Sequence, residues 1–126
     1  TGVQTCALPI CRKVESRQLE VSEFSRSLKL LAKELDVPVI AISQLNRGAE
    51  QRQDKRPLLA DLRESGSLEQ DADMVILLHR DDAYERESPR SGEADFILAK
   101  HRNGPTGKVV VAFQGHYSRF TDMAQA

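Results

Sequence analysis

Apolar residues recur at steps of three and four between residues 21 and 35. The positions are Val21, Phe24, Leu28, Leu31 and Leu35. This spacing places one apolar stripe along a helix, which we expect to begin upstream, near Val14. We expect the helix to end at Asp36-Val37-Pro38, because the residue before a proline avoids helical backbone angles.

Short apolar runs after this helix predict strands. Val39–Ile42 and Met74–Leu78 are continuous apolar runs, which are typical of strands buried on both faces in a parallel sheet covered by helices. Ala94–Ala99 and Lys108–Phe113 predict two more strands, and the residues 103–107 between them, NGPTG, are typical of a tight turn. The order of helix, strand, helix, strand and hairpin indicates the trailing half of an α/β sheet.

A long polar connection separates the first two predicted strands. Residues 43–67 are rich in Gln and Arg and show no period, and residues 47–63 hold five basic side chains against three acidic ones. A connection of this length without regular structure is unusual in a compact domain and indicates a functional loop. Ser67 and Gln70 have the spacing of a capping box, so we expect a short helix to begin at Ser67. Residues 81–92 predict a charged surface loop.

The composition is typical of one globular unit. A chain of 126 residues, of which 40% are hydrophobic and 29% charged, has room for one hydrophobic core. Its formal net charge is −1, so any nucleic-acid binding would depend on a local basic patch. The apolar runs are too short to cross a membrane. Neither the two cysteines nor the three histidines have metal-site or disulfide-framework spacing, and we expect a cytoplasmic protein without its own metal ligands.

The first ten residues do not fit the pattern of the rest. Thr1–Ile10 reads TGVQTCALPI and has neither a helical period, nor strand alternation, nor the basic start of a signal peptide. The segment matches the translation of a common sequencing adapter. We therefore expect residues 1–10 to be an artefact and the native sequence to begin near Cys11. A natural but irregular N-terminal arm is the alternative.

Two polar segments are candidates for a functional site. Gln44 follows the predicted strand Val39–Ile42, and open α/β sheets place their ligands at such strand ends. Arg63, Glu64 and Gly66 lie just before a predicted helix N-terminus, where free backbone N–H groups can hold phosphate. Each segment also has a structural interpretation, the first as a polar strand end and the second as an ordinary capped loop.

A pair of cations opens the predicted hairpin and is the third candidate. Lys100 and Arg102 are two positions apart on a strand, so their side chains project to the same side and could reach a partner's anionic site. A pair of solvated charges is the commoner reason for such a pattern. The nearby Thr106-Gly107-Lys108 is not a phosphate-binding loop, because the first Gly and the final Ser or Thr of that motif are missing.

Three motifs together resemble one protein family. They are SRSLKLLAKELDVPVIAISQLNR (25–47), DKRPLLADLRESGSLEQDAD (54–73) and KHRNGPTGKVVVAF (100–113), followed by YSRF (117–120). In order and spacing they resemble the C-terminal half of the DnaB-family replicative helicases. The resemblance implies an α/β fold, namely the C-terminal half of a RecA-like P-loop ATPase core with a mixed sheet, helices and a C-terminal β-hairpin. It also implies that the Walker A loop, the catalytic glutamate and the Walker B aspartate lie upstream of residues 11–126, which form a partial ATPase domain.

The resemblance assigns roles to the candidate residues. Gln44 would sense the γ-phosphate of bound ATP, and Lys100 and Arg102 would enter the nucleotide site of the neighbouring subunit. Arg63, Glu64 and Gly66 would contact the DNA backbone in the pore of a ring.

The same resemblance implies the activity and the partners of the whole protein. It would be an ATP-dependent 5′-to-3′ DNA helicase that unwinds duplex DNA at the replication fork as a homo-hexamer on single-stranded DNA. ATP and Mg²⁺ would be bound mainly by residues outside this chain, and primase and a helicase loader would be further partners. The chain alone is expected to be inactive. The alternatives are a RecA-like recombinase or clock-type ATPase, and a non-enzymatic DNA-binding assembly module.

Overall fold

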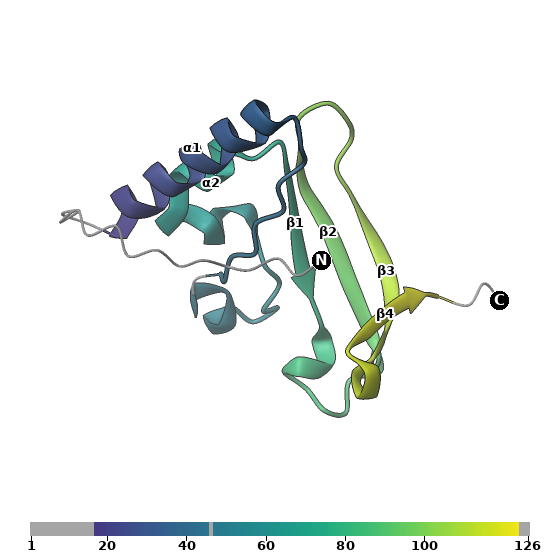
Figure 1. Ribbon diagram of the computed structural model, residues 1–126. Coiled ribbons are helices and arrows are strands. Elements are labelled where there is room, and N and C mark those ends of the chain that lie inside the picture. The colour runs from purple at the N-terminus through teal and green to yellow at the C-terminus, as the bar shows by residue number, and fades with distance from the viewer. Residues whose placement is uncertain (1–16, 46, 124–126) are drawn as a thin grey trace.

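A computed structural model describes residues 17–45 and 47–123, without the side chains of 17, 18 and 63–66. The helical elements are α1 (Arg17–Leu35), α2 (Gly66–Asp71) and the 3₁₀ helices η1 (Arg47–Gln51), η2 (Leu59–Ser65), η3 (Asp81–Ala83) and η4 (Gly115–Tyr117). The strands are β1 (Met74–His79), β2 (Glu93–His101), β3 (Gly107–Gln114) and β4 (Arg119–Asp122). Figure 1 shows α1 and α2 packed together beside the sheet, towards the end that carries the β2–β3 turn. The predicted artefact at residues 1–10 lies outside the described residues.

The strands form one sheet in the order β1-β2-β3-β4, and all three neighbouring pairs are antiparallel. Met74 pairs with His101, Ile97 with Lys108, and Phe113 with Phe120. The strands predicted at residues 74–78, 94–99 and 108–113, and the turn between the last two, are confirmed. The fourth strand was not predicted, because its four residues carry too short a pattern to separate from a loop.

The helix α1 ends where the sequence predicts, but its apolar stripe is not buried. The backbone turns out of the helix at Asp36, which has φ 53°, and the N–H of Val37 closes the last turn on the carbonyl of Ala32 (3.1 Å). Phe24 is 61% exposed and Leu31 is 44% exposed, whereas Ser25 is buried. The side of α1 that faces α2 is polar, so the contacts of α1 within the described chain differ from those predicted by hydrophobic periodicity.

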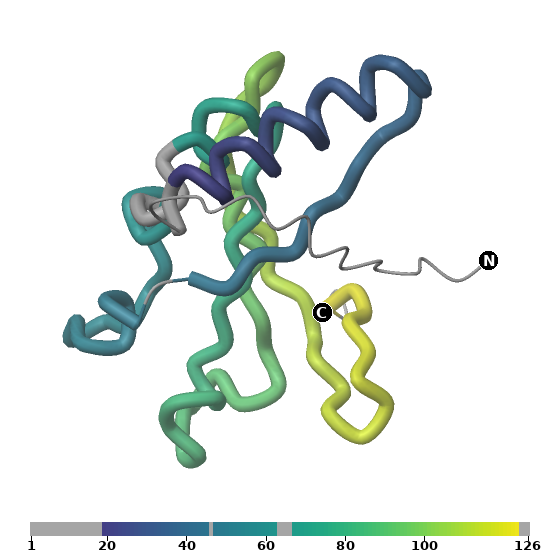
Figure 2. The backbone as a smooth tube through the Cα atoms, turned by 60° about the vertical axis from the view of Figure 1, so that its left-hand side comes forward, coloured from purple at the N-terminus to yellow at the C-terminus, as the bar shows by residue number. Residues whose placement is uncertain are grey.

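The prediction of a buried strand at Val39–Ile42 is wrong for this chain. The stretch is extended, but it joins no strand of the described sheet, and Ile40 and Ile42 are 92% and 99% exposed. Figure 2 shows this stretch running from the end of α1 towards η1 as an open connection. A strand needs a neighbour for its backbone N–H and C=O groups as well as an apolar sequence.

Burial of β1 on both faces is also not observed. Along β1 the exposure alternates, so that Leu77 is 4% exposed while Ile76 and Leu78 are 60% and 49% exposed. This alternation is typical of an antiparallel sheet that is covered on one face. The apolar run at residues 74–78 therefore predicts the strand correctly but not its surroundings.

The long polar connection is more ordered than its sequence suggests. Arg52 donates two hydrogen bonds to the carboxylate of Asp61 (2.9 and 2.6 Å) and a third to the carbonyl of Arg56 (2.6 Å). The hydrogen bonds from Arg52 hold the pKa of Asp61 below its usual value, and the backbone N–H of Leu58 donates to the same carboxylate (2.7 Å). At least one of the five basic side chains predicted for a functional loop is thus part of an internal clamp.

A buried carboxylate on β2 joins three segments of the chain. Asp95 is 1% exposed and accepts two hydrogen bonds from Arg90 (2.6 and 3.1 Å). Arg56, from the connection before η2, lies 3.6 Å from the same carboxylate, and Lys108 of β3 lies 3.9 Å from it. The Arg90 hydrogen bonds, supported by these cations, lower the pKa of Asp95 even though burial opposes ionisation. Asp95 therefore fixes the 81–92 loop and the polar connection to the sheet.

We expect Asp95→Asn to destabilise the chain by about 2 kcal/mol, because it removes the charge that compensates Arg90 at a buried position. Urea unfolding followed by circular dichroism measures this change. Asp122→Asn on the exposed strand β4 is the matched control and is expected to change the unfolding free energy by less than about 0.5 kcal/mol. Equal effects of the two substitutions would contradict the role given to Asp95.

Stability is also expected to fall in acid. The folded-state pKa of Asp95 lies below the unfolded value of about 3.9, so its contribution is complete above that value and is lost as the pH falls through the folded pKa. A series of urea titrations between about pH 5 and pH 2 should show a steep decline for the wild type. The decline should be shallower for Asp95→Asn. A parallel decline in the two proteins would assign the acid sensitivity to other carboxylates.

Candidate functional site

The antiparallel pairing of β1 with β2 brings Asp73 next to Arg102. Met74 pairs with His101, so the residues just outside the two strands also lie opposite each other. The backbone N–H of Arg102 donates to the carbonyl of Asp73 (2.9 Å), and Nη1 of Arg102 lies 2.7 Å from Oδ1 of Asp73. The two residues are therefore joined through both backbone and side chain.

Lys100 and Arg102 project to the same side of β2, as predicted, and both contact the C-terminal end of α2. Nζ of Lys100 donates to the carbonyls of Glu69 (2.5 Å) and Gln70 (3.2 Å), and Nη2 of Arg102 lies 3.5 Å from the same Gln70 carbonyl. The last carbonyls of a helix have no partner within it and carry partial negative charge. The two cations satisfy these groups, so they are held by this chain rather than only solvated.

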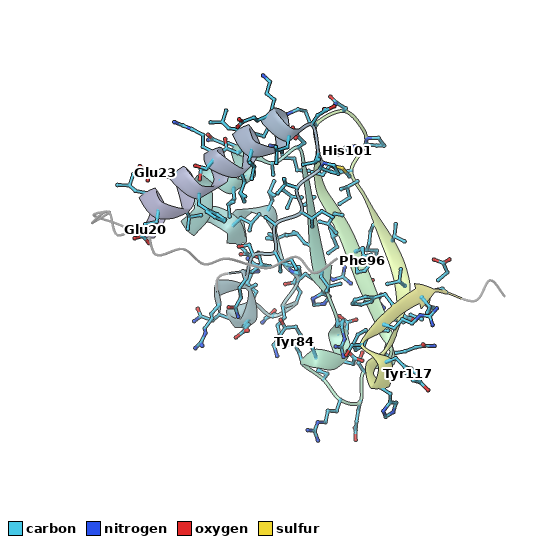
Figure 3. The ribbon with its side chains drawn as sticks, viewed as in Figure 1. Glu20, Glu23, Tyr84, Phe96, His101 and Tyr117 are labelled. Carbon is cyan, nitrogen blue, oxygen red and sulfur yellow. The ribbon has the colours of Figure 1, made fainter. Side chains whose placement is uncertain are left out.

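The turn that follows the two cations is compact. Nδ1 of His101 lies 3.2 Å from the carbonyl oxygen of Pro105, and the imidazole ring packs on Gly104. A Cβ at position 104 would come within 2.4 Å of this ring, so any other residue would displace it. Figure 3 shows His101 at the end of the sheet next to α1, and Tyr84 at the opposite end. The turn gives Lys100 and Arg102 a fixed backbone platform.

Asp73 has a second cationic partner on α1. Nζ of Lys29 contacts Oδ2 of Asp73, while Arg102 uses Oδ1. The hydrogen bond from Lys29 is the main reason that the pKa of Asp73 lies below its usual value, and the charges of Arg102 and Lys100 act in the same direction. Ser25 of α1 donates to Asp71 at the end of α2 (2.8 Å). Polar contacts thus join α1, α2 and the hairpin at one place.

The predicted DNA-binding residues lie at the other end of α2. Arg63 and Glu64 belong to η2, Gly66 begins α2, and Leu62 beside them is buried. The side chains of residues 63–66 lie outside the described part of the structure, so their contact with DNA stays a prediction. The short helix α2 nevertheless has this segment at its N-terminal end and the two hairpin cations at its C-terminal end.

Gln44 is not brought to the hairpin in this chain. It lies in the exposed extended stretch after α1. Among the residues that the structure describes, no hydrogen bond or ion pair joins Gln44 to Lys100 or Arg102. Its predicted role at the γ-phosphate therefore stays a prediction.

The chemistry of the site is that of an anion-binding surface. Its candidate side chains are cations, which fit phosphate oxygens, and residues 17–45 and 47–123 contain no cluster of three His, Cys, Asp or Glu side chains that could hold a metal ion. The phosphates of ATP fit these cations, whereas Mg²⁺ finds no ligand set here. In the same described residues, no helix is both long and apolar enough to cross a membrane.

Sequence reasoning did not single out Asp73. The residue stands in the quoted segment DLRESGSLEQDAD, but its partners Lys29 and Arg102 come from distant parts of the chain. The signal that could have found it is the strand register, because pairing residues 74–78 with 94–99 around the NGPTG turn places Asp73 near Arg102.

The comparison with protein families matches one model. The model is the DnaB-like helicase C terminal domain, and it matches residues 6–122. The replicative DNA helicase DnaB of Mycobacterium intracellulare is 79% identical over 114 residues, which are 90% of this chain and 20% of that protein. The DnaB of Geobacillus stearothermophilus is 58% identical over 112 residues, which are 89% of this chain and 25% of that protein. The chain thus spans a fifth to a quarter of these relatives.

Solved structures agree with the family match. One helicase ATPase domain superposes with a TM-score of 0.85 at 53% identity and covers 90% of this chain and 40% of that one. A DnaB-like replicative helicase, whose structure was solved together with its interactions with primase, gives the same TM-score and identity and covers 90% of this chain and 28% of that one. These likenesses confirm the RecA-like α/β fold predicted from the sequence. The chain belongs to the DnaB-like helicase C-terminal domain family.

Proposed function

We propose that this chain is the C-terminal part of the motor of a replicative DNA helicase, which uses ATP to unwind duplex DNA as a hexameric ring on single-stranded DNA. The observation that carries the proposal is the arrangement around α2. The segment Arg63–Gly66 lies at one end of this helix, and the carbonyls at its other end hold Lys100 and Arg102. One short element therefore connects the predicted DNA contact with the predicted nucleotide contact.

Lys100 and Arg102 are the residues that we propose to act on ATP in the neighbouring subunit. Arg102 leaves the end of β2 beside a compact turn, and 48% of its side chain is exposed. A guanidinium presents two N–H groups as a fork and can stabilise the charge that develops on a transferred phosphoryl group. In a ring with one repeated interface, a residue on one face of each subunit meets the site on the next.

ATP and Mg²⁺ are proposed as the cofactors of the whole protein. Gln44 is proposed to face the γ-phosphate, and Lys100 and Arg102 approach the phosphates from the other subunit. The loop that cradles the phosphates and the ligands of Mg²⁺ would come from parts of the protein outside this chain. Primase is proposed as a partner because one structural neighbour was solved with its interactions with primase. A helicase loader and a cytoplasmic location complete the proposal.

In a full-length helicase that contains this segment, Arg63→Ala should weaken binding to single-stranded DNA without changing base preference, because a backbone contact carries no sequence information. The slope of log affinity against log salt should become shallower by about one unit or somewhat less, since one fewer phosphate is neutralised. Fluorescence anisotropy with labelled oligonucleotides at several salt concentrations measures both. Lys33→Ala on the exposed side of α1 is the control, and wild-type affinity and slope in Arg63→Ala would count against a DNA contact.

Arg102→Ala in the same full-length ring should reduce ATP hydrolysis by at least about a hundredfold, within the range known for arginine fingers. Ring assembly, followed by analytical ultracentrifugation, should be unchanged. Arg102→Lys should not restore turnover, because an ammonium acts as a point charge and cannot fork two oxygens.

Mixed rings test whether Arg102 acts on the neighbouring subunit. Arg102→Ala subunits are combined with subunits that carry a defective Walker A loop. Some interfaces then pair an intact finger with an intact loop, so part of the hydrolysis should return. Normal hydrolysis by Arg102→Ala alone would refute the finger role. An inactive Arg102→Ala ring without recovery on mixing would refute action between subunits.

A further inference from the structure

We propose that Asp73 is a positioning residue that sets the orientation of the Arg102 guanidinium. This inference rests on the proposed function, because it assigns Asp73 a part in the action of Arg102 on ATP. Its basis is the double connection between the two residues, one through the backbone (2.9 Å) and one through the side chains (2.7 Å).

The contact fixes one corner of the guanidinium and leaves an edge for another anion. Asp73 Oδ1 engages Nη1 of Arg102, while Nη2 is only 3.5 Å from the Gln70 carbonyl. The edge formed by Nε and Nη2 has the fork geometry that matches two phosphate oxygens. A guanidinium held at Nη1 can therefore meet an incoming phosphate with that edge.

The exposure of the pair favours positioning over stabilisation. The side chains of Arg102 and Asp73 are 48% and 56% exposed. Exposed ion pairs contribute little to folding stability. Arginine has many rotamers, and restricting them before the reaction reduces the entropy that is lost when the phosphate is engaged. Removing the Asp73 carboxylate should therefore affect turnover much more than folding.

Each oxygen of Asp73 has its own cation, and this provides a matched control. Oδ2 contacts Lys29 of α1, and Oδ1 contacts Arg102. Lys29→Met removes the first partner and leaves the second in place. If the carboxylate acts mainly by docking α1, Lys29→Met reproduces its loss, and if it acts through Arg102, Lys29→Met leaves turnover unchanged.

The test compares steady-state ATP hydrolysis by full-length rings that contain this segment. Asp73→Ala should lower kcat by roughly three- to thirtyfold, since misplacing a reacting group by about 1 Å can cost up to about a hundredfold. KM for ATP and the thermal unfolding midpoint should stay unchanged. Asp73→Asn keeps an oxygen that accepts a hydrogen bond, so its loss of kcat should be smaller than that of Asp73→Ala.

The decisive comparison is made in the Arg102→Ala background by single-turnover hydrolysis. There Asp73→Ala should cause no further loss, because a residue that acts through Arg102 has nothing left to position. A further loss in that background, or an equal loss in Lys29→Met, would overturn the inference. An inactive Arg102→Ala ring with a fully active Asp73→Ala ring would overturn it while leaving the proposed function intact. Normal hydrolysis by Arg102→Ala would overturn both.

Discussion

Asp95 is a carboxylate on a central strand with almost no access to water, and the surrounding structure is arranged to keep it charged. Arg90 returns from the 81–92 loop to bind it on both oxygens, and Arg56 and Lys108 approach from the polar connection and from β3. An uncompensated charge at such a position would be very costly, so these segments cannot move away independently. The loop at one end of the sheet, the connection before η2 and the first hairpin thus share one electrostatic constraint.

The opposite end of the sheet is organised by helix carbonyls instead of a buried carboxylate. The end of α2 offers acceptors to Lys100 and Arg102, and Asp73 adds a full charge just beyond the helix. Because α2 is short, a displacement of its first residue is carried directly to its last. The segment proposed to contact DNA and the cations proposed to contact ATP are therefore separated by one rigid turn or two of helix, and a contact at one end changes the electrostatic surroundings of the other.

The sequence predicts the elements of this fold better than their surroundings. The end of α1, the β2–β3 hairpin and the common side of Lys100 and Arg102 follow from local rules for proline, turns and strand alternation. The burial of Val39–Ile42 does not, because a strand is buried only when other segments pair with it and cover it. The ion pairs of Asp73 and Asp95 also escape sequence reasoning, since each joins residues that only the strand register brings together. Residues in the candidate site are thus visible as types, whereas their partners are visible only in three dimensions.

The open stretch after α1 has a further consequence for the life of the polypeptide. Ile40 and Ile42 present nearly their whole side chains to solvent on an extended backbone that pairs with no described strand. Such a stretch is a template for adding strands from other molecules, and exposed apolar backbone is also what chaperones and proteases capture. The time that a chain with this surface survives in a cell is set by how quickly the stretch is covered, so assembly and degradation compete for the same few residues.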